Sequence, residues 1–430
     1  MASFIKDIFR VGFSKVLIIL FGLGTSVVTA RWIGPQGNGI IAALLVYPSL
    51  FMNIGSLGIR QSTTYFLGKN IYNEQEIKKA IIQIWMLTTF ISLLICFILI
   101  HYFSSSGNNL ALVFLAILPI PFSLFNTYNS GVFLGKNDIR TFNRINWIPS
   151  LIILIATIVF VVILKMEVKG AMIASIGGQL FMFFVLLFKN KFLKSFSIQC
   201  NWKIIKNLLS LGIVYAVSLL IIDLNYKSDI ILMDKLSNVY ELGIYSKGSA
   251  ITQYLWQIPM LFSTIVFARS AVSKNDIEFS LKVAQLLRVS FLLIGVAALI
   301  LMFFSKWIIV GMYGDNFRES ISVLNYLLPG VLILTIFKVM NMDLAGKGKP
   351  WVSLKAMLPA LIVNIILNVL LIPKLGADGA AIASTISYAL AAVLFLIFYS
   401  EVTNIPIWKI LTYKKTDFDF ILIYLKKVKK

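Results

Sequence analysis

Asn207–Met233 has the sequence NLLSLGIVYAVSLLIIDLNYKSDIILM, and this stretch constrains how the rest of the chain can fold. It is long enough to cross the hydrocarbon core of a bilayer, which takes about 20 apolar residues in a helix. Its second half nevertheless carries Asp223, Lys227 and Asp229. A charge near the bilayer centre costs about 2.5–3.5 kcal/mol on insertion scales, so such groups usually face a water-filled cavity or a partner. The rest of the chain is therefore expected to give this segment a polar interior to face.

The composition predicts an all-α polytopic membrane protein. Of the 430 residues, 59% are hydrophobic and 13% are charged, and the mean hydropathy is +0.89. Runs near 20 residues suit helices rather than barrel strands, which need about 9–11 residues. We predict about 12 transmembrane helices of this kind. They lie near 9–31, 40–63, 80–102, 110–134, 146–164, 170–188, 208–233, 243–267, 285–304, 320–342, 352–372 and 379–400.

The net charge of +21 is explained by membrane topology. With the N-terminus in the cytoplasm, the cytoplasmic connections and ends carry 28 Lys and Arg residues and the opposite connections carry 8. This asymmetry follows the positive-inside rule and places both termini in the cytoplasm. Arg60, Lys247 and Lys338 remain within the spans. Anionic membrane lipids are the expected partners of the basic loops, and no nucleic acid is expected.

The chain repeats itself at an offset of 209–211 residues. The matched segments are Gly170–Ser175 with Gly379–Ser384, Pro149 with Pro359, and Gly135-Lys136 with Gly346-Lys347. Residues 1–200 and 201–400 then form two six-helix bundles, followed by a basic cytoplasmic tail at 401–430. An even number of spans makes the bundles parallel repeats about an axis along the membrane normal, around a central cavity. Kinks at the paired prolines could let the bundles rock, or could merely shape the packing.

The polar cluster near residue 223 has no counterpart in the first half. At an offset of 210, Asp223, Lys227 and Asp229 correspond to Phe13, Leu17 and Ile19. This asymmetry favours a functional role for the cluster. The alternative is a structural ion pair, because Asp223 and Lys227 are four residues apart and share a helix face.

Other intramembrane cations are candidate site residues, but each also has a simpler explanation. Arg31 lies at the outer end of the first span and Arg60 at the inner end of the second. Both could snorkel to headgroups instead of facing a cavity. Lys338, inside the tenth span, could face an anionic substrate or snorkel likewise. Trp256 could stack on a sugar, although ordinary packing is the commoner use.

The sequence lacks the signatures of an enzyme. There is no Walker A motif, no metal-ligand spacing and a single histidine. The predicted outer loops are too short to hold an active site outside the membrane. We therefore predict a protein that is not an enzyme and needs no cofactor or metal.

Three motifs resemble those of a known transporter family. Arg31–Gly39 (RWIGPQGNG) is similar to the R-x-L-G-P-x-x-x-G signature of polysaccharide flippases. Asn53–Ile59 (NIGSLGI) resembles their second-span pattern, and Leu242–Tyr245 (LGIY) resembles the segment that opens their second half. Over residues 1–400 the chain resembles the Wzx-type oligosaccharide flippases of the multidrug/oligosaccharidyl-lipid/polysaccharide exporter superfamily.

This resemblance implies a substrate and a location. The substrate would be an undecaprenyl-pyrophosphate-linked oligosaccharide, moved from the cytoplasmic to the outer leaflet of a bacterial inner membrane. Arg31, Arg60, Lys227 and Lys338 are the candidates for the pyrophosphate, since Arg and Lys form charge-assisted hydrogen bonds with phosphate. Asp223 and Asp229 are the candidates for coupling to H⁺ or Na⁺. A glycan polymerase complex is a further candidate partner.

Three alternatives stay open at this point. Lipid II flippases are similar but often carry fourteen spans. Multidrug or cation antiporters of the same superfamily often place an acid in the first span, whereas here Phe21–Ser26 contains none. A third alternative, from another class, is a membrane scaffold for glycan synthesis that transports nothing.

Overall fold

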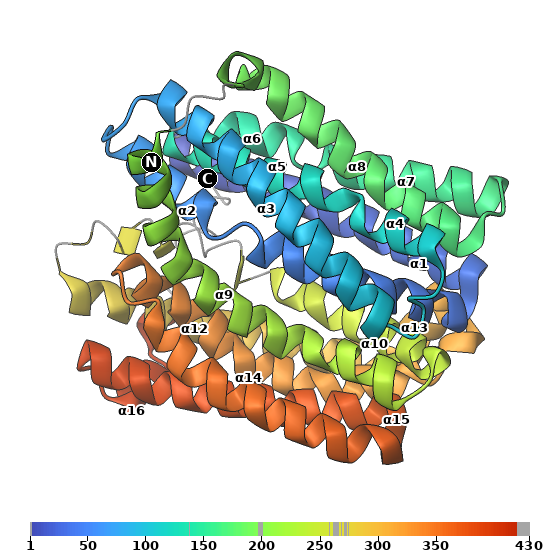
Figure 1. Ribbon diagram of the computed structural model, residues 1–430. Coiled ribbons are helices and arrows are strands. Elements are labelled where there is room, and N and C mark those ends of the chain that lie inside the picture. The colour runs from blue at the N-terminus through green and yellow to red at the C-terminus, as the bar shows by residue number, and fades with distance from the viewer. Residues whose placement is uncertain are drawn as a thin grey trace. The chain divides into compact units, whose positions relative to one another are not determined.

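A computed structural model describes residues 2–136, 138–196, 201–257, 259–260, 266–267, 269–270, 273 and 275–418 (Figure 1). Over these residues every regular element is a helix. Within them, eight helical segments are long and apolar enough to cross a membrane. The tail predicted at 401–430 is described only as far as Phe418, and part of the span predicted at 243–267 lies outside the described residues.

The chain divides into two compact units. Unit 1 comprises Met1–Lys247 and Met312–Phe317, and unit 2 comprises Gly248–Gly311 and Arg318–Lys430. The two bundles predicted at 1–200 and 201–400 stay a prediction. The compact units divide the chain after Lys247, so the stretch Asn207–Met233 lies in unit 1. Its polar half is therefore packed among helices from the first half of the sequence.

Nine α-helices of unit 1 lie wholly before Lys247, in the part of the chain that the structure describes. They are α1 (Ala2–Ile54), α2 (Ile59–Gly68), α3 (Glu74–Phe103), α4 (Leu110–Ile117), α5 (Pro119–Gly135), α6 (Ile139–Ile145), α7 (Ile148–Thr157) with the π-helix η1 (Ile158–Ile163), α8 (Glu167–Lys189) and α9 (Trp202–Leu236). The 3-10 turns η2 (Phe192–Ser195) and η3 (Asp315–Phe317) complete it, and α10 (Val239–Leu255) begins in unit 1 and ends in unit 2. Helix α7 packs along α8 (Figure 1).

Helix α1 contains the first predicted span and most of the second, on either side of a kink. Gly34 has φ 74° and ψ −179°, a conformation that side chains with a Cβ rarely adopt. The kink frees carbonyl oxygens from their helical partners. Asn38 satisfies two of them, because its Nδ2 donates to Thr29 O at 2.9 Å and to Gly34 O at 2.7 Å.

Helix α3 shows a surface typical of a lipid-exposed helix. Leu87, Phe90, Leu94 and Ile98 are 59%, 67%, 52% and 43% exposed, and their spacing of three and four residues makes one stripe. The opposite face is buried and includes Ser92. A soluble protein would bury the apolar stripe, so this pattern fits a helix whose outer face meets lipid tails.

Unit 2 is built on three long helices. Its described elements are the end of α10, α12 (Asp276–Phe303), most of α13 (Ser305–Tyr313), α14 (Ser320–Gly346), α15 (Trp351–Thr403), α16 (Ile407–Leu411) and η4 (Lys415–Phe418). Helix α14 packs against α12 and α15. Helix α15 is broken at Gly376 (φ 53°, ψ −128°), so the predicted spans 352–372 and 379–400 lie on its two sides.

One buried carboxylate ties the helices of unit 2 together. Asp343 on α14 is fully buried. It accepts hydrogen bonds from Ser280 Oγ on α12 at 2.7 Å and from Tyr399 OH on α15 at 2.6 Å. Ser270 Oγ donates at 2.6 Å, and Lys347 Nζ lies 3.0 Å from Oδ2. Two hydroxyl donors from neighbouring helices, together with one cation, make this carboxylate a major determinant of packing in unit 2.

The two Gly-Lys motifs of the sequence repeat make equivalent contacts in their own units. In unit 1, Lys136 at the end of α5 pairs with Glu74, the first residue of α3. In unit 2, Lys347 at the end of α14 donates to the carbonyl oxygen of Asp276, the first residue of α12, at 3.0 Å. Each lysine thus fastens the end of one long helix to the start of another.

The C-terminal segment, residues 407–418, is fastened to α12 by a buried ion pair. Arg288 Nε and Nη2 donate to the two carboxylate oxygens of Asp417 at 2.6 and 2.7 Å. Arg288 Nη1 also donates to Ile410 O at 2.8 Å, at the end of α16. Arg288 and Asp417 are 5% and 1% exposed. This bidentate geometry is the strongest form of an arginine–carboxylate contact.

This ion pair predicts a pH-dependent docking of the C-terminal segment. The hydrogen bond from Arg288 holds the pKa of the Asp417 carboxyl below its usual range, against an opposing effect of burial. A lowered folded-state pKa means that the stabilisation is present above the unfolded value, about pH 3.9, and is lost as pH falls through the folded value. The fluorescence of Trp408, taken as the difference between wild type and Trp408→Phe, should be constant from neutral pH to about pH 5 and change below about pH 4. The same transition in Asp417→Asn would contradict this assignment.

Candidate functional site

The second predicted span, 40–63, is interrupted within the motif NIGSLGI (Asn53–Ile59). Helix α1 ends at Ile54 and α2 begins at Ile59, with Leu57 at φ 45° and Gly58 at φ 63° between them. Non-helical backbone at membrane depth is tolerated only where it is buried in protein or lines a water-filled cavity. Here Tyr128 OH donates to the carbonyl oxygen of Gly55 at 2.8 Å. The motif NIGSLGI therefore encodes a helix break, and such breaks form the binding sites of many transporters.

Helix α9 crosses this break at backbone contact. A Cβ added to Gly58 would overlap the carbonyl oxygen of Gly212 on α9, and a Cβ added to Gly212 would overlap the carbonyl oxygen of Leu57. Glycine at both positions lets the two backbones touch. Eleven residues make three turns of a helix, so Asp223 lies on the same face of α9 as Gly212.

Asp223 faces the end of α1. Asn53 Nδ2, one residue before the end of α1, donates to Asp223 Oδ2 at 2.7 Å. Lys227 lies one turn further along α9, close enough to be attracted by the Asp223 carboxylate. The amide of Asn53, the carboxylate of Asp223 and the ammonium of Lys227 together form a polar group beside the break. It combines a carboxylate that can bind a cation with a cation that can bind phosphate.

Two further cations lie near the break between α1 and α2. Arg60 is in the first turn of α2 and its side chain is exposed. Lys15 on α1 is half-buried and close enough to Arg60 for the two charges to repel each other. Within the described residues, neither has a carboxylate within ion-pair distance. Adjacent cations of this kind attract an anionic ligand. Lys15 was not predicted as a site residue.

Asp229 lies on a different face of α9 from Asp223. It is 1% exposed, accepts a hydrogen bond from Tyr245 OH, and has Ser228 Oγ at 3.5 Å. Six residues along a helix rotate a side chain by about 240° from its starting direction. The structure therefore separates the two acidic candidates, with Asp223 toward α1 and Asp229 toward α10.

The other two family-like motifs touch each other. A Cβ at Gly39 would overlap Val239 O at the start of α10, and a Cβ at Gly243 would overlap Pro35 O beside the kink of α1. These glycines belong to RWIGPQGNG and LGIY respectively. Both motifs are therefore required for the same close packing of α1 on α10.

Lys247 is a buried cation that was not predicted as a site residue. It is 7% exposed, and its Nζ donates to Thr29 Oγ1 at 2.8 Å and to Ser26 O at 3.1 Å, both on α1. The ring of Tyr313 lies 5.5 Å away, and the Tyr313 hydroxyl bonds Ser26 Oγ at 3.1 Å. Its spacing of four residues from Gly243, on the packed face of α10, is the signal that could have found it.

The remaining cationic candidates have partners of their own. Arg31 is exposed, and its Nε donates to Met312 O at 2.9 Å. Lys338 on α14 lies in unit 2, with its Nζ 4.2 Å from the ring centroid of Trp256. Two residues selected for separate roles thus form a cation–π pair. Arg31, Arg60, Lys227, Asp223 and Asp229 all lie in unit 1.

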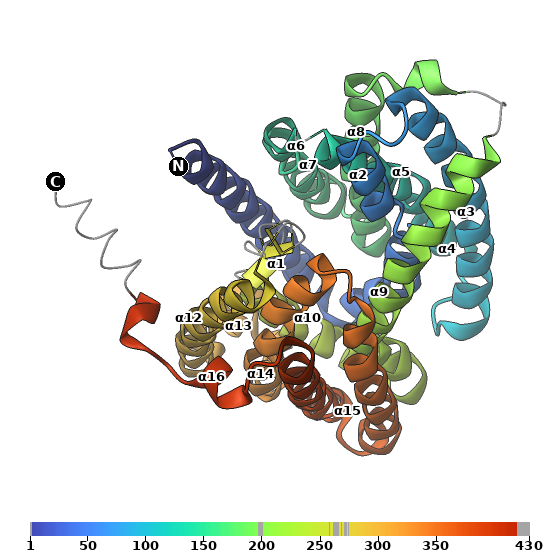
Figure 2. The same cartoon turned by 90° about the vertical axis from the view of Figure 1, so that its left-hand side faces the viewer.

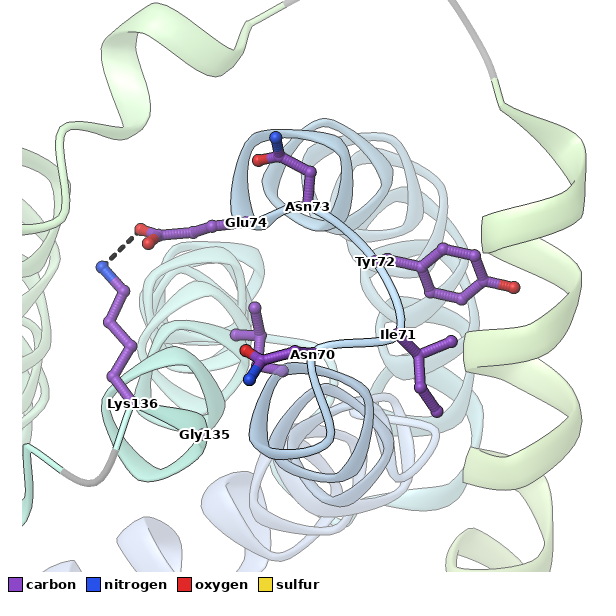
Figure 3. A pocket seen from close by; sticks show the side chains of 8 residues that line it. Asn70, Ile71, Tyr72, Asn73, Glu74, Gly135 and Lys136 are labelled. Atoms are coloured by element: carbon purple, nitrogen blue, oxygen red, sulfur yellow. Dashed lines mark ion pairs between the residues drawn. The ribbon is translucent and has the colours of Figure 1, made fainter.

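A cavity of about 380 Å³ opens at one end of unit 1 (Figure 3). The loop between α2 and α3 lines it with polar side chains, and Lys136 pairs with Glu74 on one side (Figure 3). A second cavity of about 470 Å³ has Tyr65, Phe66 and Asn207 in its lining. Tyr72 accepts a hydrogen bond from Asn207 Nδ2 at 2.5 Å. None of the six candidate site residues lines either cavity.

Comparisons with known sequences point to polysaccharide biosynthesis. Residues 4–268 match the family model described as "Polysaccharide biosynthesis protein". The chain is 23% identical over 399 residues to the "Putative O-antigen transporter" of Shigella flexneri, covering 87% of this chain and 93% of that protein. It is 27% identical over 176 residues to the "Probable low-salt glycan biosynthesis flippase Agl15" of Haloferax volcanii, covering 38% of this chain and 37% of that protein.

Solved structures of transporters have the same fold. A structure of the lipid II flippase MurJ, in an inward closed conformation, has a TM-score of 0.75 at 17% identity, over 94% of this chain and 89% of that chain. An inward-facing multidrug resistance MATE family transporter of the MOP superfamily has a TM-score of 0.72 at 14% identity, over 90% of this chain and 94% of that chain. These likenesses confirm the predicted all-helical, multi-pass membrane fold.

Proposed function

This chain belongs to the polysaccharide biosynthesis protein family, and on that premise we propose that it flips an undecaprenyl-pyrophosphate-linked oligosaccharide from the cytoplasmic to the outer leaflet of a bacterial inner membrane. The family is one of glycan transporters and not of enzymes. The observation that carries the proposal is the helix break at residues 55–58, which packs against Gly212 of α9, together with Asp223 in the charged half of α9, which accepts a hydrogen bond from Asn53 just before the break. A break and charges at membrane depth are costly unless they are buried in protein or face a water-filled cavity, and such a cavity can admit a polar substrate.

Transport proceeds by alternating access of two six-helix bundles around a central cavity. The kinks at Gly34 and Gly376 divide α1 and α15 into two spans each. The number of described spans is then close to the predicted 12. Both termini lie in the cytoplasm, as the distribution of Lys and Arg indicates. Equivalent contacts of Lys136 and Lys347 support the repeat relation between the bundles.

The pyrophosphate is bound by cations and the lipid tail stays in the bilayer. Arg60, with Lys15 beside it, and Lys227 are the candidates near the helix break. Arg31 and Lys338 are candidates further away, and each must exchange its present partner for phosphate oxygens. Such exchange favours weak and reversible binding, which a transporter needs. Anionic lipids and a glycan polymerase complex are the proposed partners.

A proton or sodium gradient drives the cycle through an intramembrane carboxylate. Asp223→Asn keeps the size of the side chain and removes its charge. Because a hydrogen bond to a charged group is worth about 1.5–3 kcal/mol, we expect the flipping rate to fall about tenfold to a hundredfold and to lose its dependence on the gradient. Flipping is measured in vesicles with an imposed pH or sodium gradient.

Asp229→Asn is the matched comparison, because it makes the same change on the face of α9 that contacts Tyr245. Retained gradient dependence in this variant would assign the coupling to Asp223, and the reverse result would assign it to Asp229. Unchanged gradient dependence in both variants would refute coupling through either carboxylate.

A second candidate function is suggested by the fold. The MurJ and MATE likenesses suggest a lipid II flippase or a multidrug/cation antiporter built on the same helices. The two classes of substrate differ in what accumulates when the transporter is lost. A lipid-linked glycan accumulates if a flippase is lost, whereas sensitivity to cationic drugs increases if an antiporter is lost.

Depletion of the protein in its host distinguishes these functions. The undecaprenyl-linked pool is measured by mass spectrometry together with the surface polymer. We expect one lipid-linked oligosaccharide to accumulate on the cytoplasmic face and the matching surface glycan to be lost. An unchanged pool with intact surface glycan would refute the proposed function, and drug-efflux assays would then test the antiporter.

A further inference from the structure

The C-terminal segment, residues 407–418, presents an aromatic and basic face at the end of the described chain. Trp408 and Tyr413 are 63% and 47% exposed, although both are large and largely apolar. Lys409, Lys414 and Lys415 are exposed as well, and Lys409 Nζ lies 5.4 Å from the ring centroid of Trp408. Aromatic rings beside lysines are typical of protein surfaces at the boundary between headgroups and acyl chains.

This face has a fixed position because its other side is anchored to α12. Besides the Arg288–Asp417 ion pair, Gln285 Nε2 donates to Thr416 O at 2.9 Å and Tyr413 OH donates to Arg288 O at 3.1 Å. Figure 2 shows α16 lying beside α12. An unstructured basic tail would not need these contacts. The segment is therefore built to hold its outer side chains in one place.

The charges of the segment are arranged to favour an anionic partner. Asp417 is the one acidic residue in the segment 407–418. Its carboxylate is buried and neutralised by Arg288. The exposed side therefore carries the three lysines with no opposing exposed charge of its own. Each lysine near an anionic membrane surface adds an attraction that falls off within the screening length.

The anchoring helix places this face at the depth of the headgroups. A helix of 28 residues such as α12 is about 42 Å long, which exceeds the hydrocarbon core of about 30 Å. Its ends must therefore reach the headgroup layers. The span predicted from hydropathy starts at residue 285, and the contacts to the C-terminal segment come from Gln285 and Arg288.

We propose that the C-terminal segment is a docking site for anionic phospholipid headgroups, with Trp408 inserted at the acyl boundary and Lys409, Lys414 and Lys415 on the phosphates. Arg288 acts as a positioning residue, because it binds the segment and not the lipid. Unlike the transport cycle, this site needs no glycan substrate, so it can be tested on the purified chain.

Quenching by brominated lipids tests the proposal. The full chain is placed in vesicles that contain phosphatidylcholine and phosphatidylglycerol at one fixed ratio, with bromine on one lipid or on the other. The Trp408 signal is the difference between each protein and its own Trp408→Phe partner. After correction for the lipid ratio, brominated phosphatidylglycerol should quench this signal at least about twofold more than brominated phosphatidylcholine.

Two lysine variants and one anchor variant complete the test. Lys409→Gln with Lys414→Gln and Lys415→Gln should abolish the preference. A matched control, Lys165→Gln with Lys169→Gln and Lys374→Gln, changes three exposed lysines elsewhere and should keep it. Asp417→Ala retains the three lysines but should lower the preference by releasing the segment. Equal quenching by both lipids in wild type, no quenching by either, or an unchanged preference in the first variant would overturn the proposal.

Discussion

Replacing Asp343 by alanine is expected to lower the free energy of unfolding by about 3–5 kcal/mol, the usual cost of removing one partner of a buried ion pair. The carboxylate is fully buried and accepts from side chains on α12 and α15. Its loss leaves the ammonium of Lys347 with fewer acceptors and two buried hydroxyl groups without theirs. Because α14 is the helix that contacts both α12 and α15, unit 2 should loosen as a whole.

The measurement is the midpoint of unfolding of purified protein in detergent, by heat or by a denaturing detergent. Glu278→Gln is the matched control, because Glu278 also pairs with a lysine four residues away, Lys282, at 2.7 Å. That pair is exposed on both sides, so its loss should change stability by less than about 1 kcal/mol. Similar shifts in the two variants would contradict the role assigned to Asp343.

The second large effect is expected for Gly58→Ala at the break between α1 and α2. Gly58 has φ 63°, and a left-handed conformation costs a residue with a Cβ about 1–2 kcal/mol. The new Cβ would also overlap Gly212 O, and overpacking adds about 1–3 kcal/mol. To relieve the overlap, α9 must move away from the break, which separates Asp223 from Asn53. We therefore expect glycan flipping to fall by about tenfold or more.

Gly311→Ala is the control for this substitution. Gly311 lies in α13 with open space around the position of a Cβ, so alanine should fit there without loss of transport or stability. Both variants are compared with wild type by the yield of folded protein and by the flipping rate per folded molecule. A Gly58→Ala protein that flips at the wild-type rate would contradict the importance of the break.

The fold was largely predictable because hydropathy reports directly on membrane spans. Apolar runs located the long helices, but the span predicted at 40–63 is broken after Ile54, and the connection predicted between the first two spans is a kink at Gly34 within α1. The backbone geometry at those places was not predictable. A glycine in an apolar run can continue a helix or end it, and only the packing partners decide which occurs. At Gly58 the deciding partner is Gly212, which is 154 residues away in the sequence.

The candidate site was predicted in part. The charged half of α9 was identified by the cost of burying charge, but the partner of Asp223 on α1, Asn53, lies 170 residues away. Lys338 and Trp256 were selected separately, and their contact depends on how α14 packs in unit 2. Lys247 was missed because a lysine among apolar residues looks the same in sequence whether it snorkels or is buried. Its partners Ser26 and Thr29 are common residues in membrane helices and give no signal.

The most direct test of the central claim is a flipping assay with the purified chain in vesicles. Undecaprenyl-pyrophosphate-linked oligosaccharide extracted from depleted host cells is placed in both leaflets, and a sugar-modifying enzyme outside the vesicles reports which molecules are accessible. With wild-type protein and an ion gradient, nearly the whole pool should become accessible, while vesicles with Gly58→Ala should lag behind. Accessibility that stops at the outer half of the pool, as in protein-free vesicles, would contradict the proposal that this chain is a glycan flippase.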